Sequence, residues 1–433
     1  MKLSNVKGTK DYLPAEQIIR ERIISALTEV FQLYGFCPLD TPALEYFELL
    51  SAKYAGGAEI LKETFTLNDR KDRQLGLRYD LTVPFSRVIA SNPQLKLPFK
   101  RYQISKVWRN GPIGLGRYRE FQQCDIDVVG SKNMKADAEI LAVASDVFKK
   151  LDLDAVIKVN SRKILNAILD KLEISNIEDA ILVIDKIEKL NKDEILEEFK
   201  QKGISSITAE KIIDFFTKIK GKDAEKLQQL EKTLTSEEGK QGIKEIRELF
   251  IYLKSYKINA AFEPSLARGL SFYTGTVFET FLNKSNIKSA VASGGRYDKI
   301  IGKLLDSKQE YPAVGISFGL DRIYDALLDA KLVESRATNT EVYIIPINID
   351  NEAIEIIQKI RKAGINAETD IIGRGLSKNL DYANTMKIPF VIFIGKQEIE
   401  NNKLKLRNMN TGEENMLPIE KIIEALKSAP TAK

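Results

Sequence analysis

The sequence contains no histidine, and among its 433 residues it has only two cysteines and one tryptophan. Without imidazole, histidine-based metal sites, Ser-His-Asp triads and imidazole acid–base catalysis are excluded. Any chemistry must therefore use carboxylates, arginines, hydroxyl groups, the backbone and groups of the substrate itself. This absence restricts the possible reactions more than any other feature of the composition.

Cysteines and long apolar runs are also scarce. Cys37 and Cys124 lie in apolar or strand-like segments without metal-ligand spacing, so we expect two buried thiols in a reducing compartment. No apolar run approaches the roughly 20 residues of a membrane-spanning helix, and residues 1–13 lack the apolar centre of a signal peptide. We therefore predict a cytoplasmic protein that does not enter a membrane.

The length and the balance of residue types describe a globular chain. The hydrophobic fraction is 43% and the charged fraction 29%, and a chain of this length suffices for two or three domains. The net charge of +5 permits a nucleic-acid partner but does not indicate one by itself.

The most informative stretch is residues 102–130. Its alternation predicts two strands joined by a glycine-rich turn at 110–116. Because successive side chains point to opposite faces, one face of the second strand is mostly apolar and would pack on a core. The other face carries Phe121, Gln123, Asp125, Asp127 and Val129. Such a face is either a solvated surface or the floor of a polar pocket, and a solvated surface is the commoner case.

Arginines around this hairpin favour the pocket. Arg109, Arg117 and Arg119 bracket the glycine-rich turn, and arginine holds phosphate through planar, bidentate contacts. This combination suits a triphosphate lying over a sheet beside an amino-bearing substrate. Arg322 is expected in the first turn of a helix that follows a strand. Arg109, Arg268 and Arg322 are each expected at a turn beside one sheet. Together they are stronger evidence for a phosphate-binding site than any one of them alone.

Two further corners have both a structural and a functional interpretation. Asp80 and Thr82 lie where a strand ending at Tyr79 meets a helix, with Thr82 as the expected N-cap. They either cap this helix or hold a substrate ammonium, and the two roles are compatible. Gly294 and Gly295 predict a turn between a strand and a helix, whose backbone N–H groups would face an anion. Most such turns are only turns.

Helical and strand periods divide the chain into parts. Residues 14–34 predict a long amphipathic helix, and residues 164–256 combine helical periodicity with few glycines and no catalytic motif. This all-helical insertion would interrupt an α/β unit formed by residues 1–163 and 257–332. The pattern βαβαβββα in residues 338–433 predicts a separate α/β domain with a mainly parallel sheet.

Four separated segments resemble histidyl-tRNA synthetases, a family of class II aminoacyl-tRNA synthetases. They are LRYDLTVP, the motif 2 hairpin with GRYREF and QQCDID, the histidine signatures ARGLSFYTGTVFE and SGGRYD, and GISFGLDR as motif 3. The resemblance spans essentially the whole chain and includes the order of its domains. It implies an α/β (α+β) fold, with a class II antiparallel-sheet catalytic domain, a helical insertion and a C-terminal α/β anticodon-binding domain.

The resemblance implies ATP-dependent ligation of L-histidine to tRNA(His) through a histidyl-adenylate. ATP and Mg²⁺ would take part, with Mg²⁺ bound mainly through the ATP phosphates and not by a protein metal site. The helix at 14–34 and the proline-bearing strand after it resemble motif 1, which implies a homodimer. A protein without histidine can carry out this reaction, because the nucleophile is the ionised substrate carboxylate and no general base is needed.

For ATP, the resemblance implies that Arg109 contacts the α-phosphate and the region of the histidine carboxylate. Arg268 would stabilise the α-phosphate as the adenylate forms, and Arg322 would contact the γ-phosphate. Glu120 would lie near the adenine. Catalysis would then rest on positioning and on stabilising charge around phosphorus, with Arg109 and Arg268 as the catalytic residues.

For the amino acid, the resemblance implies that Asp80, Thr82 and Gln123 hold the α-ammonium. Asp127 and Tyr273 would read the imidazole nitrogens. Histidine would be selected because an apolar isostere leaves these buried groups unpaired.

Two departures from the family pattern affect the details. Where the family usually has Asp-Tyr-Tyr, this chain has Ser271, Phe272 and Tyr273, so that Phe272 lacks a hydroxyl beside the substrate. The motif 2 loop between Arg109 and Gly116 is shorter than in eukaryotic-type members. Recognition of the tRNA acceptor end is therefore less firmly implied than activation of the amino acid.

Two other functions remain open. A synthetase-like regulatory subunit of ATP phosphoribosyltransferase would bind histidine as a signal without catalysis, but such paralogues typically lack the C-terminal domain and lose motif arginines. This chain keeps both. A class II synthetase for another amino acid is the third possibility, and Asp127, Tyr273 and the ARGLSFYTG signature favour histidine.

Overall fold

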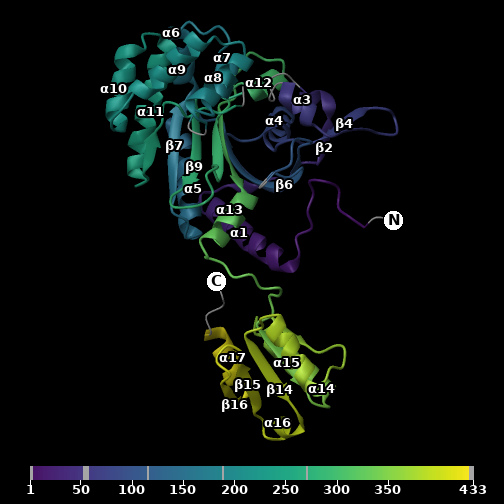
Figure 1. Cartoon of the computed structure of the whole chain (residues 1–433). Helices are drawn as coiled ribbons and strands as arrows, with labels where there is room; N and C mark the ends of the chain where they lie inside the picture. The colour runs from purple at the N-terminus through teal and green to yellow at the C-terminus, as the bar shows by residue number, and fades with distance from the viewer. Residues whose placement is uncertain (1–2, 52–57, 115–116, 188–189, 270–271, 429–433) are drawn as a thin grey trace. The chain divides into compact units, whose positions relative to one another are not determined.

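The computed structural model describes residues 3–51, 58–114, 117–187, 190–269 and 272–428 (Figure 1). The chain forms two compact units. The first contains the residues up to Lys10 together with Ile23–Leu332, and the second contains Asp11–Arg22 together with the residues from Val333 onward. The expected contributions of Gly116 and Ser271 lie outside the described residues.

The first unit is built on an eight-stranded sheet with the order β1-β5-β6-β11-β10-β9-β7-β8. Its strands are β1 (Cys37–Pro38), β5 (Phe99–Trp108), β6 (Glu120–Val129), β7 (Ala155–Ser161), β8 (Ala260–Phe262), β9 (Thr276–Leu282), β10 (Ala292–Arg296) and β11 (Ala313–Gly319). Neighbouring strands run antiparallel except for β1 beside β5 and β7 beside β8. The predicted antiparallel catalytic sheet is confirmed.

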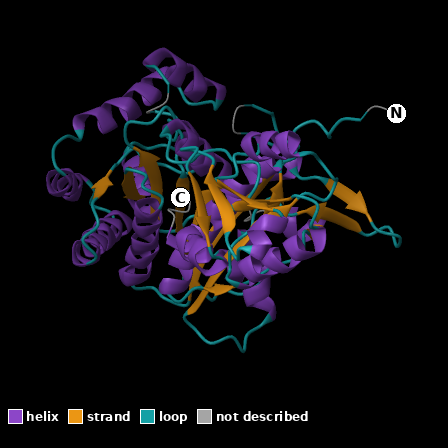
Figure 2. Ribbon diagram, turned by 90° about the horizontal axis from the view of Figure 1, so that it is seen from below, coloured by secondary structure: helices purple, strands orange, loops and turns teal. Residues whose placement is uncertain are grey.

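The apolar face of this sheet packs against helices α1 (Pro14–Leu33) and α5 (Met134–Lys150); Figure 2 shows helices in purple and strands in orange. Phe318 of β11 packs against Phe31 of α1, with ring centroids 5.5 Å apart. It also packs against Phe148 of α5, at 6.0 Å. The expected amphipathic helix and the expected apolar face of the hairpin therefore meet in one core, which leaves the opposite face of the sheet for polar residues.

A smaller sheet, with the order β2-β4-β3, and three helices precede β5 in the chain, and the backbone N–H of Trp108 at the end of β5 donates to the carbonyl of Arg78 just after β4. These elements are β2 (Leu44–Tyr46), α2 (Phe47–Ser51), α3 (Ala58–Glu63), β3 (Thr66–Asn68), β4 (Gln74–Leu77) and α4 (Thr82–Ser91). The expectation that Thr82 is the N-cap of α4 is wrong, because Leu81 occupies that position. Asp80 Oδ1 instead accepts the backbone N–H groups of Thr82 (3.0 Å) and Val83 (2.9 Å), since a carboxylate satisfies free helix donors well.

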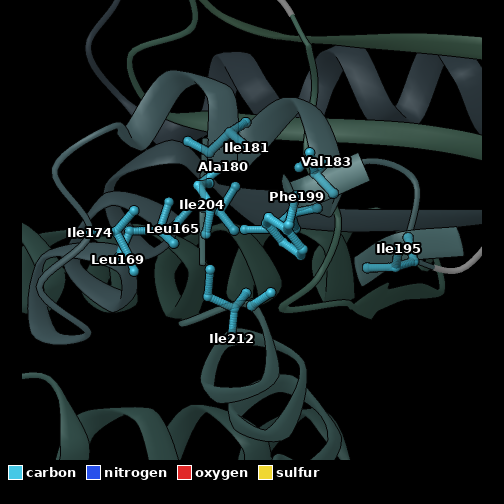
Figure 3. Close-up of a cluster of buried hydrophobic side chains, with 13 residues drawn as sticks. Leu165, Leu169, Ile174, Ala180, Ile181, Val183, Ile195, Phe199, Ile204 and Ile212 are labelled. Atoms are coloured by element: carbon cyan, nitrogen blue, oxygen red, sulfur yellow. The ribbon is translucent and has the colours of Figure 1, made fainter. Parts of the chain in front are cut away.

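The described residues between 162 and 255 form helices, in agreement with the helical segment predicted at 164–256, and Figure 1 shows these helices grouped next to β7. They are α6 (Arg162–Lys171), α7 (Ile177–Ile184), α8 (Lys192–Gln201), α9 (Ser206–Lys218), α10 (Asp223–Thr233) and α11 (Glu237–Ser255). Asn191 caps α8 in a capping box with Glu194. Leucine, isoleucine and phenylalanine side chains such as Leu169, Phe199 and Ile212 form the core of this segment (Figure 3).

The turn expected at Gly294 and Gly295 is wrong, because both residues lie within β10. Their backbone groups belong to the sheet, between β9 and β11, so they do not form an anion-binding turn. Glycine is required by close approach: a Cβ on Gly294 would lie 2.0 Å from the carbonyl oxygen of Gly315, and one on Gly295 would lie 2.5 Å from that of Thr276. The helices that follow are α12 (Ile300–Leu304) and α13 (Leu320–Asp329).

The sequence predicted two buried cysteines and no membrane-spanning helix. Cys124 is buried as expected, but Cys37 is exposed, because it lies on the short edge strand β1. Within the described ranges, no helix is both long enough and apolar enough to cross a membrane.

The second unit contains a five-stranded sheet with the order β13-β12-β14-β15-β16. Its elements are β12 (Val342–Pro346), α14 (Asp350–Lys362), β13 (Ala367–Thr369), α15 (Leu376–Thr385), β14 (Phe390–Ile394), α16 (Lys396–Glu400), β15 (Leu404–Asn408), β16 (Glu414–Leu417) and α17 (Ile419–Ser428). The predicted α/β pattern is confirmed, with the short helix α16 in addition. The sheet is less parallel than expected, since the hairpin of β15 and β16 joins it antiparallel to β14.

Candidate functional site

The polar face of β6 is buried and not solvated. Asp125 is 5% exposed and Asp127 is 4% exposed. Asp125 lies opposite Ser317 of β11 in the sheet, and Gln123 Nε2 donates a hydrogen bond to the Ser317 hydroxyl at 3.3 Å. Of the two interpretations of this strand, the structure therefore favours a buried polar site.

Asp127 is held from two sides by buried partners. Arg101, on the neighbouring strand β5 and fully buried, forms an ion pair with Asp127 Oδ2 at 2.7 Å. The hydroxyl of Tyr297 donates to Asp127 Oδ1 at 2.5 Å. Burial raises the pKa of Asp127, while Arg101 and the Tyr297 hydrogen bond oppose this rise. Gly315 provides the space, because a Cβ at that position would lie 1.9 Å from Oδ1.

Asp125 differs from Asp127 in lacking such partners. Its Oδ1 is buried and has no hydrogen-bond partner among the residues the structure describes, and the same holds for Oε1 of Gln123. Burial raises the pKa of the Asp125 carboxyl to about 7, with Arg101 lowering it and the charge of Asp127 raising it. Two buried acceptors thus lie side by side on β6 without donors.

The burial of the Asp125 carboxyl has a consequence for stability. Because the pKa of Asp125 is about 7 in the folded protein and about 3.9 in an unfolded chain, folding is penalised by the ionised form above pH 7. We expect Asp125→Asn to raise the free energy of unfolding of the ligand-free protein at pH 8 by up to about 4 kcal/mol. The gain should shrink as the pH falls from 7 towards 4, because Asp125 is then protonated in the folded protein, and near pH 4 it also becomes protonated in the unfolded chain.

Urea unfolding of wild type and Asp125→Asn at several pH values measures this difference. Asp381→Asn, at an exposed position on α15, is the matched control and should show no such pH-dependent gain. An Asp125→Asn protein that is less stable than wild type at pH 8 would contradict the expectation.

Arg268 forms a partly buried ion pair. Its guanidinium bonds to the carboxylate of Glu279 on β9, which is 5% exposed. Burial lowers the pKa of Arg268, but the nearby Tyr273 and Glu279 outweigh this effect, so the pKa is raised and the side chain stays charged. Its Nε is buried and lacks a partner among the described residues, which leaves one N–H donor for a ligand.

The three predicted arginine corners lie within electrostatic reach of one another. Arg322, in the first turn of α13 as predicted, donates to the carbonyl of Ala290 at 2.6 Å. Its pKa is lowered first by burial and then by the positive charges of Arg268, Arg117 and Arg109. Such mutual repulsion indicates a local surplus of positive charge, which suits the binding of a polyanion.

Arg109 directly follows β5, where the loop of the β5–β6 hairpin begins. Its guanidinium lies over the rings of Tyr79 (4.3 Å) and Phe121 (5.0 Å), and Nε donates to the Tyr79 carbonyl at 3.2 Å. Asp80, next in the chain, has a pKa raised by burial and opposed by its backbone hydrogen bonds and by Arg109. Asp80 therefore serves as a helix cap and also lies beside the arginines, so its two interpretations remain compatible.

Aromatic residues cover the other end of this face. Tyr273 and Phe272 lie with ring centroids 4.7 Å apart, and Tyr297 meets Phe272 edge-on at 6.1 Å. Gly295 lets the Tyr273 ring lie close to β10, because a Cβ there would come within 2.8 Å of the ring. Burial raises the pKa of Tyr273, opposed by Arg268, and the charge of Asp125 contributes to the rise. Tyr273 is therefore near both Arg268 and Asp125.

Glu120 is the predicted site residue that the structure does not bring to this face. Its carboxylate accepts from Lys106 Nζ at 2.7 Å and from Trp108 Nε1 at 2.9 Å. Because alternate residues of β6 face opposite ways, Glu120 points away from the side that carries Gln123 and Asp125.

A cavity of about 1650 Å³ adjoins the aromatic end of the site. Phe272 and Tyr273 line it on one side, and Arg162 and Lys163 of α6 line it on another. The cavity therefore borders the aromatic end of the site next to the helical segment.

Sequence reasoning did not single out Arg101, Tyr297, Glu279 or the special state of Asp125. Asp125 had a signal, because QQCDID places it on the same strand face as Gln123 and Asp127. Arg101 had none, since its pairing with Asp127 depends on the register of β5 against β6.

Comparison with known proteins extends these observations over the whole chain. The family model described as histidyl-tRNA synthetase matches residues 8–323, and the one described as anticodon binding domain matches residues 341–429. The chain is 45% identical to histidine–tRNA ligase 1 of Bacillus cereus, over 97% of this chain and 98% of that protein.

Solved structures give the same comparison in three dimensions. The histidyl-tRNA synthetase from Nostoc sp. PCC 7120 aligns with a TM-score of 0.86 and 31% identity over 99% of both chains. A protein described as an ATP phosphoribosyltransferase regulatory subunit/histidyl-tRNA synthetase from Bacillus halodurans aligns with a TM-score of 0.73 over 91% of this chain. Its identity of 23% shows only a shared fold.

Proposed function

This chain belongs to the histidyl-tRNA synthetase family, and we propose that it ligates L-histidine to tRNA(His) at the expense of ATP. One observation carries the proposal: Arg109, Arg268 and Arg322 act on one another electrostatically next to a buried acidic strand face. That arrangement suits a triphosphate and an amino acid held side by side.

In the first step, an oxygen of the histidine carboxylate forms a bond to the α-phosphorus of ATP. The bond from that phosphorus to the β-phosphate oxygen breaks, and pyrophosphate leaves. The carboxylate is ionised at neutral pH, so no side chain has to remove a proton. The protein contributes by holding the reactants in line and by stabilising charge on the phosphorus oxygens.

We assign the phosphate contacts to the arginines. Arg109 and Arg268 would lie at the α-phosphate, where the Nε–H of Arg268, which has no partner among the described residues, offers a donor, and Arg322 would contact the γ-phosphate. The buried Nε and the surplus of positive charge fit a polyanion. Mg²⁺, which accompanies ATP in such reactions, would reach the site on the phosphates and neutralise part of their charge. Glu120 remains the residue predicted for the adenine. It is the first residue of β6, next to the hairpin loop.

We assign the amino acid to the acidic face. Asp80, beside Arg109, would hold the α-ammonium with Thr82 and Gln123, since the ammonium and the carboxylate of an amino acid share one carbon. Asp127, Tyr273 and the neighbouring Phe272 would surround the imidazole. Buried groups that need donors reject a side chain that offers none.

The remaining assignments concern the whole chain. We propose residues 1–163 and 257–332 as the catalytic domain, 164–256 as its helical insertion and 338–433 as the anticodon-binding domain. A homodimer through the motif 1 region and a cytoplasmic location complete the proposal. Both agree with family membership.

The first experiment is ATP–pyrophosphate exchange with purified protein and each amino acid in turn, followed by charging of tRNA(His). We expect exchange with histidine alone and histidine-dependent charging. Histidine binding without exchange would instead support the regulatory subunit of ATP phosphoribosyltransferase. Exchange with a different amino acid would point to another class II synthetase.

A further inference from the structure

The chain reaches Arg268 through a short segment, residues 262–269, that begins at the edge of the large sheet. β8 is the last strand in that sheet, and the N–H and C=O of its final residue, Phe262, face outward from its neighbour β7. Two side chains of α10 bond to these groups. Asp223 Oδ1 accepts from the Phe262 N–H at 3.1 Å, and Lys226 Nζ donates to the Phe262 carbonyl at 2.8 Å. The helical segment α6–α11 therefore fixes where this stretch begins.

The middle of residues 262–269 is held by the sheet itself. Asn160, which is fully buried on β7, donates through Nδ2 to the carbonyls of Pro264 (2.8 Å) and Leu266 (2.9 Å). Because one amide group bonds to both carbonyls, this backbone has little freedom to shift along β7. The direction in which the chain approaches Arg268 is therefore set by contacts on both sides of it.

The far end of residues 262–269 packs against α7 of the helical segment. Ala267 is 1% exposed and belongs to the same buried cluster as Ile181 of α7, which Figure 3 labels. Gly269 lies close to Leu182 of α7, since a Cβ on Gly269 would lie 3.0 Å from Leu182 Cδ2. Arg268 thus lies between two residues that both rest on α7.

Charge also links α7 to the guanidinium of Arg268. Burial lowers the pKa of this guanidinium, but Tyr273, Glu279 and Asp185 raise it by more. Asp185 is the C-cap of α7 and lines a cavity of about 540 Å³ together with Glu279, the ion-pair partner of Arg268. The carboxylate at the end of α7 therefore lies near this ion pair.

We propose that the helical segment is a positioning element for Arg268: α10 and α7 hold the two ends of residues 262–269, so that the guanidinium is in place as charge develops on the α-phosphate. This inference rests on the proposed function, because it concerns the step that forms the adenylate. Lys226 and Leu182 are positioning residues, since they act through Arg268. A displacement of about 1 Å at a reacting group can cost about 100-fold in rate, so contacts remote from the substrate control this step.

The test measures ATP–pyrophosphate exchange with histidine for Lys226→Met and its matched control, Lys232→Met, which removes an exposed lysine from the same helix. We expect Lys226→Met to lower kcat by about 10–100-fold. KM for histidine and KM for ATP should stay within about twofold of wild type, because Arg268 acts mainly in the transition state. Lys232→Met should exchange normally. A general loss of folded protein would not separate kcat from KM in a sample corrected for active enzyme.

A second variant tests the other end of residues 262–269. Leu182→Ala removes a half-buried side chain that contacts Gly269, and it should lower kcat in the same way by a smaller factor. Ile207→Ala, which removes a side chain that is 72% exposed on α9, is its control and should leave exchange unchanged. This variant also decides the proposal if Lys226→Met does not fold.

Combination with Arg268→Ala identifies the route by which these residues act. When the guanidinium is absent, its position no longer matters, so adding Lys226→Met or Leu182→Ala should cost no more than about twofold. If the losses multiply instead, the two residues act on exchange independently of Arg268, and the proposal is wrong.

The same measurements distinguish this inference from the proposed function. Wild-type protein that shows no exchange with histidine would refute the proposed function and this inference with it. If wild type exchanges while folded Lys226→Met and Leu182→Ala keep its kcat, only the positioning role of the helical segment is refuted.

Discussion

Arg268→Ala is expected to reduce ATP–pyrophosphate exchange with histidine by about 10²–10³-fold, the usual loss when one donor to a developing charge is removed. Arg268 is partly buried and stays charged, and its Nε–H has no partner among the described residues, close to Arg322. The loss should appear mainly in kcat, because the interaction strengthens as charge builds up on the α-phosphate oxygens.

The variant also leaves the buried carboxylate of Glu279 without its partner, which by itself destabilises the fold. The double variant Arg268→Ala with Glu279→Gln removes that charge and separates the two effects. It should regain stability and remain inactive. Arg247→Ala, which removes an exposed arginine paired with Glu231, is the matched control and should exchange normally. Wild-type exchange in a folded Arg268→Ala protein would remove this residue from the chemistry.

Arg101→Met is expected to lower the free energy of unfolding of the first unit by about 3–5 kcal/mol, because it leaves Asp127 charged, buried and without its cation. Arg101 is fully buried and pairs with Asp127 on the neighbouring strand β6. Urea unfolding followed by tryptophan fluorescence reports on this unit, since the single tryptophan, Trp108, lies at the end of β5.

A second substitution tests the cause of that loss. Arg101→Met combined with Asp127→Asn removes both charges and should recover part of the stability, as is common for buried ion pairs. Glu29→Gln breaks the exposed pair between Glu29 and Lys150, and it should change nothing measurable. If Arg101→Met unfolds like wild type, the ion pair has no structural role.

Much of the fold could be predicted because the decisive patterns are local. The alternation in residues 102–130 gave both strands of the hairpin, and the helical period gave the helix at 14–34 and the helical segment after residue 162. Each of these depends on which side of one element is buried. The apolar and polar faces of β6 were likewise separable from the sequence alone.

What could not be predicted depends on neighbours distant in the chain. Gly294 and Gly295 lie in a strand and not in a turn. They are glycines because β9, β11 and the Tyr273 ring leave no room for a side chain. The unequal states of Asp125 and Asp127 arise from Arg101 and Tyr297, whose positions depend on strand register and on a later segment. The N-cap position was misplaced by one residue, at Thr82 and not at Leu81, for a simpler reason, since threonine is a good capping residue by type.

The strand order of the large sheet has a consequence for synthesis on the ribosome. One edge of β6 pairs with β5, which directly precedes it in the chain. Its other edge pairs with β11, which is made much later: Gln123 of β6 and Ser317 of β11, which are hydrogen-bonded, are 194 positions apart in the sequence. At ~5–20 residues per second, β6 waits about 10–40 s for that partner. Until then its second edge, with Asp125 and Asp127, is open to wrong pairing. A nascent chain that stops before β11 would therefore lack the Ser317 side of the site and carry an unpaired strand edge, which makes it a target for chaperones and proteases.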